Sequence, residues 1–379
     1  MGRYHIPFFQ PLSPWELLTL PRDLQSTYPF SAHRRRHYYL ARNAIWHGIE
    51  ALGLEAGNEI LFPAYHHGVD LDVVQARGLV PVWYGIDRAA RLDLEDLKRS
   101  LTPRTKAVYV IHYFGFPQPI LEIRAFAREH GLALIEDCAL SLFSAIPEGP
   151  LGSFGDIGVF CLYKSLPMPH GGTLALNRSD LKVPERPPRI DRMSSLSYVI
   201  HLLLDYVALR IEGVGPPLVS LGREMGRATK RTMNLDVVPI DTNELDTRVL
   251  PLGMSNIARY LLARTKPEEV VRIRRENFLH MKSLLDPRIR PLYPELPSHV
   301  CPLSYPILVE DKTRVHEELL RDSVGNVNFW LRWRPGVPAE RFPDVDYLRR
   351  HVLEVPIHQG LRKKHIEFVA ERVNARVLG

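Results

Sequence analysis

The chain has 379 residues, of which 45% are hydrophobic and 24% charged; these are values of an ordinary globular protein, and the length suggests two domains. No run of about 20 apolar residues is present, which argues against a membrane span. The formal net charge is +6, from scattered basic residues apart from the run Arg34, Arg35 and Arg36. Without a zinc finger, an RRM-like aromatic pattern or a basic heptad array, nucleic-acid binding is not expected. A solvated face or a phosphate-handling edge is favoured for this run over contact with anionic lipid.

Three cysteines are present, Cys138, Cys161 and Cys301, and none is in a CxxC spacing. A sparse and odd set of cysteines argues against a disulfide scaffold and against zinc. The N-terminal segment also lacks the basic, apolar and small-residue pattern of a secretory signal. A location in the reducing cytoplasm is therefore expected.

Residues 1–25 are rich in proline and aromatic residues and indicate an extended arm. A helical pattern follows over residues 37–52 and ends at Gly53 and Gly57. Short apolar segments typical of strands then alternate with helical patterns. The expected strands cover residues 59–62, 79–83, 106–111 and 132–135, and the expected helices cover 69–76, 94–101 and 120–130. This alternation predicts βαβ units, a buried parallel sheet and helices on both of its faces.

Two further strands, at residues 157–162 and 173–176, precede a break in the alternation. The later elements are expected to be helices over 250–264, 267–285, 313–320 and 362–377 and strands over 304–309 and 353–357. We predict an α/β protein in three parts: an arm at residues 1–25, a large domain at 26–242 and a small C-terminal α/β domain at 243–379. Residues 178–242 form a divergent insertion or connection within the large domain.

An apolar helix is predicted over residues 196–211, inside this divergent segment. It carries His201, Asp205 and Arg210, so it is not a membrane span. Its apolar stripe consists of Tyr198, Leu202, Leu203, Tyr206 and Leu209. Packing of this stripe on the body of the protein or on a partner subunit is favoured over a position on a membrane surface.

Polar residues follow the ends of the predicted parallel strands: His67, His112, Asp137 and Lys164. Ligands of open parallel sheets bind beyond the carboxyl ends of the strands, so these side chains should converge on one crevice. Lys164 lies between a buried apolar strand and a turn rich in proline and glycine. Desolvation there would lower its pKa and favour Schiff-base chemistry, although a surface loop lysine remains the alternative.

Asp137 ends an apolar strand, where a buried carboxylate needs a cationic partner. In an enzyme that uses pyridoxal 5′-phosphate (PLP), such a carboxylate holds the pyridine nitrogen protonated. A helix cap or a metal ligand are the alternatives for Asp137. No second cluster of metal-binding type is nearby, so no metal is expected.

Several segments carry a resemblance to a known family. They are LFPAY at 61–65, GLVPVWYGID at 78–87 with Leu92-Asp93, LTPRTKAVYVIHYFG at 101–115, LIED at 134–137, GSFGDIG at 152–158, the pair Gly171-Gly172, and LEVPIHQGL at 353–361. In their order and spacing, over nearly the whole chain, they resemble the DegT–StrS family of sugar aminotransferases within the fold-type I PLP enzymes. The resemblance implies a large domain with a mostly parallel sheet flanked by helices and a smaller C-terminal domain.

The resemblance also implies roles for particular residues. Lys164 would form the Schiff base with PLP, Asp137 would pair with the pyridine nitrogen, and His67 would stack on the ring unless it is an ordinary loop histidine. The remaining expected cofactor contacts are Arg42 and Asn43 at the helix N-terminus that grips the phosphate, Cys161 in the strand before the lysine, and His112 in a His-x-x-Gly turn, with a role more structural than chemical.

Three positions depart from the family pattern. Leu140 replaces a glutamine that touches the ring hydroxyl, His170 replaces a glutamate before the double glycine, and Arg42-Asn43 falls in a Ser-Gly-Thr segment. These changes predict an unusual polar lining of the pocket. Lys164 argues against the branch of the family that has histidine instead and performs dehydration.

The implied function is transfer of an amino group from glutamate or glutamine to a keto-sugar nucleotide by a cytoplasmic homodimer. The product would be an amino sugar for a surface polysaccharide or a secondary metabolite. The alternatives are a non-catalytic or regulatory protein of this fold, or a PLP enzyme with a non-sugar substrate.

Overall fold

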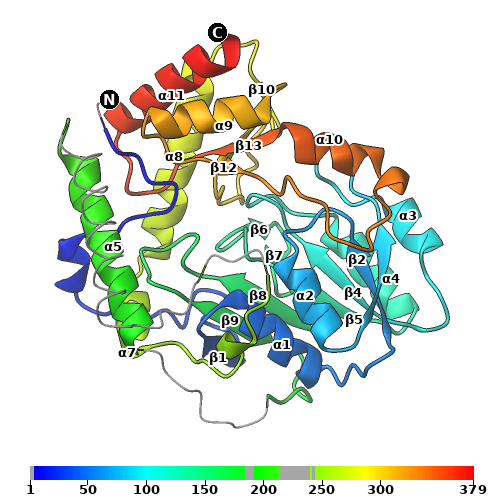
Figure 1. The fold of residues 1–379 in the computed structure, drawn as a ribbon. Coiled ribbons are helices and arrows are strands. Elements are labelled where there is room, and N and C mark those ends of the chain that lie inside the picture. The colour runs from blue at the N-terminus through cyan, green and yellow to red at the C-terminus, as the bar shows by residue number, and fades with distance from the viewer. Residues whose placement is uncertain (1–3, 184–191, 214–239, 241–243) are drawn as a thin grey trace.

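The computed structural model describes residues 4–183, 192–213, 240 and 244–379, and its centre is a seven-stranded sheet in the order β1-β9-β8-β5-β4-β2-β3 (Figure 1). The strands are β1 (Arg34–Tyr38), β2 (Glu59–Pro63), β3 (Val80–Tyr84), β4 (Thr105–Ile111), β5 (Ala133–Asp137), β8 (Ile157–Cys161) and β9 (Gly172–Leu176). β3, β2, β4, β5 and β8 pair in parallel, whereas β9 runs antiparallel to both of its neighbours. The predicted α/β fold with a mostly parallel sheet is confirmed.

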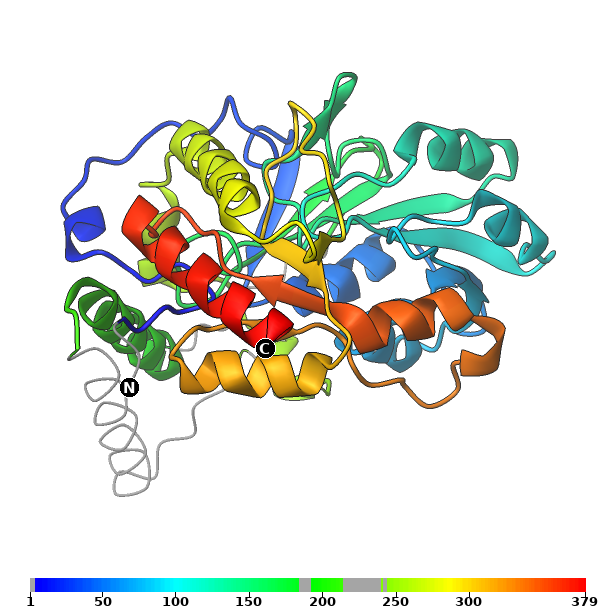
Figure 2. The ribbon, with the colours of Figure 1, turned by 90° about the horizontal axis from the view of Figure 1, so that it is seen from above.

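Helices cover both faces of this sheet. They are α1 (Ala41–Ala51), α2 (Val69–Ala76), α3 (Leu94–Arg99) and α4 (Ile120–Glu129). In Figure 2, α1 and α2 lie on one side of the sheet and α4 on the other. Every residue of β2 and β8 is buried, which explains why these strands read as continuous apolar runs without alternation. A short hairpin of β6 (Ala145–Ile146) and β7 (Gly149–Pro150) lies between β5 and β8 in the chain.

The predicted helix at residues 37–52 was wrong at its beginning. Arg34–Tyr38 forms strand β1, and the helix begins only at Ala41. The segment RRRHY has no apolar alternation, and its strand conformation depends on pairing with β9, which lies more than a hundred residues later in the chain. Such a non-local pairing overrides the weak local preference of the segment.

A second sheet occupies the C-terminal part of the chain, in the order β10-β11-β13-β12 with all pairs antiparallel. Its strands are β10 (Arg290–Pro291), β11 (Tyr305–Leu308), β12 (Val327–Asn328) and β13 (Val352–Val355); the helices of this part are α7 (Asn256–Leu262), α8 (Pro267–Leu284), α9 (Lys312–Arg321), α10 (Pro343–His351) and α11 (Lys363–Leu378), with 3-10 turns at Thr247–Val249 and Ala339–Arg341. α11 packs against α8 and α9, as Figure 1 shows. α10 and the two-residue strands were not predicted; the boundary predicted at residues 242 and 243 lies outside the described residues.

The N-terminal arm lies along the second sheet and along helix α5 (Arg192–Arg210). Ile6 bridges to Val324, the backbone N–H of Leu12 donates to the carbonyl of Leu202, and the 3-10 turn Pro14–Leu17 follows. Asp205 of α5 lies 3.5 Å from His5. The predicted stripe of α5 therefore packs on the body of the protein: its members are half-buried, and Leu209 is fully buried. Among the described residues, no helix is both long and apolar enough to cross a membrane.

Candidate active site

A cavity opens at the edge of the large sheet where β5 and β8 end and α1 and α2 begin. Its lining consists of Leu40, Ala41, Arg42, Ile45, His67, Val69, Asp70, Ile111, Asp137, Ala139, Leu140, Cys161, Tyr163, Lys164 and Trp330. Five predicted site residues are in this lining: Lys164, Asp137, His67, Arg42 and Cys161. The other two, Asn43 and His112, are not.

The topology explains why Lys164 and Asp137 meet. β5 and β8 are parallel neighbours, so both carboxyl ends lie at the same edge of the sheet. Asp137 is the last residue of β5, and Lys164 follows the last residue of β8, Cys161, by three positions. Two residues that are distant in sequence therefore reach the same cavity.

Asp137 is a buried carboxylate with a perturbed pKa. Its Oδ1 accepts from the backbone N–H of Ala139 (2.8 Å) and its Oδ2 accepts from the hydroxyl of Tyr109 (2.5 Å). Burial raises the pKa of Asp137 from its ordinary 3.8 to about 6, and the charge of Asp70 adds to this, whereas the bond from Tyr109 and the charge of Lys164 lower it. A carboxylate has about four acceptor positions, so Asp137 retains capacity for a cationic N–H of a ligand.

The N-terminus of α1 forms one wall of the cavity. Its N-cap residue, Leu40, provides no side-chain acceptor for the N–H groups of the first turn. Gly172 of β9 allows the close approach of this turn, because a Cβ at that position would lie 2.2 Å from the carbonyl oxygen of Leu40. An uncapped helix N-terminus beside the Arg42 side chain is a suitable site for an anion.

Asn43 lies in the same helical turn but points away from the cavity. Its Oδ1 accepts from the backbone N–H of Leu40, and its Nδ2 donates to the carbonyls of Val249 and Leu252. The side chain is fully buried and links α1 to the chain after the divergent segment. Contact of the Asn43 side chain with a phosphate therefore has no support in this arrangement.

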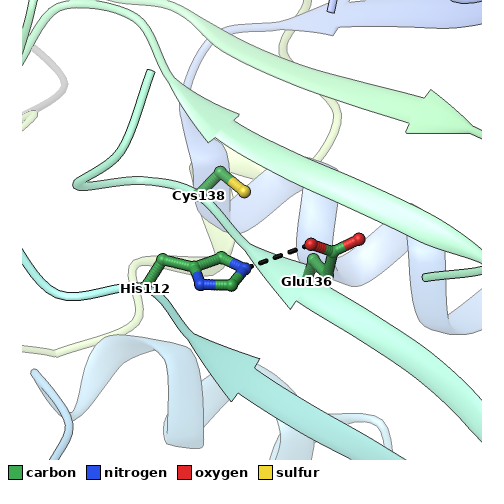
Figure 3. Close-up of side chains that lie close together, drawn as sticks. All are labelled: His112, Glu136 and Cys138. Atoms are coloured by element: carbon green, nitrogen blue, oxygen red, sulfur yellow. Dashed lines mark hydrogen bonds and ion pairs between the residues drawn. The ribbon is translucent and has the colours of Figure 1, made fainter. Parts of the chain in front are cut away.

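His112, Glu136 and Cys138 form a buried cluster below the cavity, with potential metal-ligand atoms within 4.8 Å of one another (Figure 3). His112 Nδ1 accepts from the backbone N–H of Gln118 (3.0 Å), which leaves Nε2 to donate to Glu136 (3.1 Å). Glu136 also accepts from the N–H groups of Gly152, Phe154 and Gly155. Burial, and then the charge of Glu136, raises the pKa of the Cys138 thiol.

Each potential metal ligand of this cluster is therefore already occupied by hydrogen bonds or by a proton. The histidine nitrogens both have partners, the carboxylate has four donors around it, and the thiol stays protonated, whereas a metal needs a thiolate. The hydrogen bonds of Glu136 connect the end of β4 to the loop before β8. The structural role expected for His112 agrees with this geometry.

Trp330 lines the cavity, and no motif or local pattern in the sequence indicates this. Its φ of +46° lies in the left-handed region that non-glycine residues rarely adopt. Arg349 of α10, 1% exposed, holds this loop: its Nη1 donates to the carbonyls of Trp330 (2.5 Å) and Arg332 (2.9 Å). Its Nη2 reaches the carbonyls of Ala64 (3.1 Å) and His66 (3.3 Å). One guanidinium thus joins the loop before His67 to the loop of Trp330.

Replacing Arg349 with Met should lower the free energy of unfolding by about 3–5 kcal/mol, because four buried carbonyls lose a charged donor. Urea titration of the variant measures this loss. Arg350→Met is the matched control: Arg350 is exposed on the same helix, and its one ion pair among the described residues is with Asp346, so its loss should change stability by less than about 1 kcal/mol. Equal small effects of both changes would contradict the role given to Arg349.

Asp70 is a second buried carboxylate in the lining. Its Oδ1 accepts from the backbone N–H groups of Gly68 (2.8 Å) and Leu71 (3.0 Å), and His66 Nδ1 lies 3.6 Å away. In the sequence, Asp70 and Asp72 read as ordinary acidic residues in the first turn of a helix. Only the fold shows that the side chain of Asp70 lies at the cavity.

The two other departures from the family pattern, Leu140 and His170, differ in where they lie. Leu140 lines the cavity, whereas His170 does not. His170 is buried; its Nε2 lies 3.0 Å from the hydroxyl of Ser195 and 2.8 Å from that of Ser255. Burial lowers the pKa of His170 to about 3, so it is neutral. It links α5 to the start of α7 and does not contribute to the polar lining of the cavity.

Comparison with known proteins places these features in a family context. The sequence model of the DegT/DnrJ/EryC1/StrS aminotransferase family matches residues 41–186. A GDP-perosamine synthase of Vibrio cholerae is 31% identical over 135 residues, which is 35% of this chain and 37% of that protein. The UDP-N-acetyl-3-dehydro-alpha-D-glucosamine 3-aminotransferase of Acidithiobacillus ferrooxidans is 34% identical over 124 residues, 32% and 34% of the two chains. The matched segment thus spans about a third of the length of these curated relatives.

Solved structures agree over the whole chain. The aminotransferase TlmJ of Streptoalloteichus hindustanus has a TM-score of 0.68 at 22% identity, with 98% of this chain and 99% of that one covered. PseC of Helicobacter pylori, an aminotransferase of pseudoaminic acid biosynthesis, has a TM-score of 0.69 at 15% identity, with 99% of both chains covered. An Escherichia coli GDP-4-keto-6-deoxy-D-mannose-3-dehydratase with bound hydrated PLP has a TM-score of 0.64 at 16% identity, with 97% and 100% covered. At these identities the likeness confirms the fold, which aminotransferases and a dehydratase share.

Proposed function

We propose that the chain is a member of the DegT/DnrJ/EryC1/StrS aminotransferase family, whose sequence model matches residues 41–186, and that it is a PLP-dependent aminotransferase acting on a keto-sugar nucleotide. The amino donor is glutamate or glutamine, and the product is an amino sugar for a polysaccharide or a secondary metabolite. One observation carries the proposal: a single cavity combines Lys164, the buried Asp137 and the uncapped N-terminus of α1 with Arg42.

The residues of this cavity fit PLP in their chemistry. The uncapped first turn of α1 and the Arg42 side chain suit its phosphate, and Asp137 suits the protonated ring nitrogen. His67 lies at the cavity with its ring edge-on to Trp330 (6.3 Å between centroids, 74°), so both aromatic groups are available to pack beside a planar ring. Cys161 and Leu140 complete the wall with apolar or weakly polar surface.

Bound PLP supplies an electron sink for the breaking of a bond to hydrogen at a substrate carbon. Lys164 would hold the cofactor through Nζ, and its free amine would move a proton between the substrate carbon and the C4′ carbon of the cofactor in each half of the reaction. Asp137, whose carboxylate is held by Tyr109 and Ala139, would keep a proton on the ring nitrogen. Arg42 and the N-terminus of α1 would hold the phosphate of the cofactor.

A panel of keto-sugar nucleotides tests the proposal. PLP-loaded protein incubated with glutamate or glutamine should convert at least one acceptor to the amino product, which mass spectrometry detects as the exchange of oxygen for NH₂. Bleaching of the visible PLP band by the donor alone reports the first half of the reaction. Bleaching without any aminated nucleotide would indicate a non-sugar acceptor. A band that no donor changes would indicate a non-catalytic member and would refute the proposal.

We further propose that the protein is a cytoplasmic two-fold homodimer, as the family resemblance implies. Met193, Leu196 and Ile200 of α5 are about half exposed (48%, 55% and 50%) and follow one another at helical spacing, which supports a packed partner. Light scattering at micromolar concentration should give the mass of a dimer. A monomer that floats with liposomes would overturn this proposal and would favour a lipid-linked substrate.

A further inference from the structure

A second cavity lies along strand β1, apart from the active site. Arg35 and His37 of β1 line it, whereas Leu40 and Arg42, just beyond the end of that strand, line the active-site cavity. The two cavities share no lining residue. The second has a volume of about 290 Å³, well above the roughly 10–15 Å³ that is needed to hold one water.

Three arginines from separate parts of the chain line this cavity: Arg22 of the N-terminal arm, Arg35 of β1 and Arg259 of α7. Arg35 donates to the carbonyl of Ala32 (3.0 Å) and Arg259 to that of Met254 (3.4 Å). Within the described part of the chain, none of the three has a carboxylate within ion-pair distance. Positive charge is therefore gathered here without an anionic partner from the described chain.

One carboxylate, Asp23, also lies in the lining, and its Oδ1 accepts from the backbone N–H of Gln25 (2.8 Å). His37 adds no charge at neutral pH: burial, and then the charges of Arg259 and Arg35, lower its pKa to about 4. Three guanidinium groups against one carboxylate leave a formal charge of 3 − 1 = +2 at the cavity. Arg36, beside Arg35 in the chain, also lowers the pKa of Arg259 after burial does, so the like charges affect one another.

Part of the lining of this cavity is apolar. Phe30, which is 3% exposed, and Leu262 contribute to it. Arg22, Arg35 and Arg259 are exposed, so an anion can reach their guanidinium groups from the solvent. Guanidinium groups match the oxygens of phosphate with paired N–H donors, so a cluster of arginines is better suited to phosphate than to a single carboxylate.

We propose that this cavity is a binding site for a phosphate-bearing anion, a phosphate ester or a polyphosphate, separate from the active site. Arg35 and Arg259 bind the phosphate oxygens, and Arg22 approaches from the arm. Of the three-arginine run in the sequence, only Arg35 takes this role: Arg34 donates instead to the carbonyls of Ser179 (2.7 Å) and Leu181 (3.0 Å). The phosphate-handling edge considered from the sequence is thereby assigned to one residue of the run.

Calorimetric titration with inorganic pyrophosphate tests the site, on protein saturated with PLP so that the cofactor's phosphate site in the active-site cavity is already occupied. Saturable binding of one pyrophosphate per chain is expected, weakening with added salt. Arg35→Gln and Arg259→Gln should each weaken it at least tenfold. Arg259→Lys, which keeps the charge but loses the paired donors, should fall between. Arg128→Gln removes the same charge from the exposed surface of α4 and should leave the affinity within twofold.

Thermal unfolding of each variant confirms that it is folded, and the lysine variant provides the test if a glutamine variant is not. No saturable binding to the PLP-loaded protein would overturn the proposal. So would wild-type affinity in both Arg35→Gln and Arg259→Gln, or a loss of binding in Arg42→Gln as large as theirs, which would place pyrophosphate in the active site. The titration requires no turnover, so its outcome is independent of the reaction proposed above.

Discussion

Asp137→Asn should reduce turnover by about 10³-fold while PLP remains bound. A neutral amide cannot hold the proton on the ring nitrogen, and loss of a group that controls a proton in the reaction typically costs 10²–10⁴ in rate. A factor of 10³ corresponds to about 4 kcal/mol in the activation barrier. Steady-state rates and the PLP absorption spectrum of the variant measure the two effects separately.

The same change should stabilise the protein that lacks PLP. In the folded chain Asp137 has a pKa of about 6 against an ordinary 3.8, so between these values the folded state binds more protons than the unfolded state. Stability therefore falls as pH rises from about 4 to 6, and the cost above pH 6 is at most about 3 kcal/mol. Asn carries no charge and avoids that cost. The variant should unfold at a higher temperature than wild type at pH 7, and the difference should vanish near pH 4.

Together the two measurements separate a functional from a structural carboxylate. A structural Asp137 would give near-normal turnover, or a variant less stable than wild type at pH 7. Glu136→Gln provides the contrast on the neighbouring residue. Its carboxylate accepts from three backbone N–H groups and His112, so its replacement should destabilise the protein at pH 7 with or without PLP.

Lys164→Arg should abolish turnover, with a loss of at least 10³-fold, and should prevent covalent attachment of PLP. Arginine keeps the positive charge but stays protonated, so it can neither act as a nucleophile nor return a proton. After borohydride reduction of wild-type protein, peptide mapping should place the cofactor on Lys164. In the variant, PLP should be removable by dialysis.

Lys182→Arg is the matched control, because Lys182 is an exposed lysine beyond β9. It should keep wild-type turnover and the same labelled peptide. A reduced adduct on any lysine other than Lys164, or residual turnover within tenfold of wild type in Lys164→Arg, would sink the assignment of the nucleophile.

Much of the large sheet could be predicted from sequence because its strands are short apolar runs between helices. β2, β4 and β5 were predicted to within two residues at each end, and α2 with its observed bounds. Strand β1 could not be predicted, since RRRHY forms a strand only through its partner β9. The two-residue strands β10 and β12 are also defined by their neighbours in space.

The candidate site divides along the same line. Residues at strand ends, such as Asp137 and Lys164, were predicted because the topology of a parallel sheet places them. Trp330 and Asp70 were not predicted, because tertiary contacts place each of them at the cavity and such contacts leave no local sequence pattern. For Trp330 this contact is the hydrogen bond that Arg349 donates to its carbonyl. Asn43 shows the opposite case. It lies in the first turn of α1 as predicted, but its side chain donates to the carbonyl of Val249 and does not line the cavity.

The adjacent pair Glu136 and Asp137 has a consequence for how the strand finds its place. Neighbours on a strand face opposite sides of the sheet, so a shift of β5 by one residue would turn both side chains to the opposite faces. Asp137 would then leave the cavity, and Glu136 would lose its bonds to His112 and to the N–H groups of Gly152, Phe154 and Gly155. The bonds of Glu136 therefore favour the one register of β5 that presents Asp137 to the cavity.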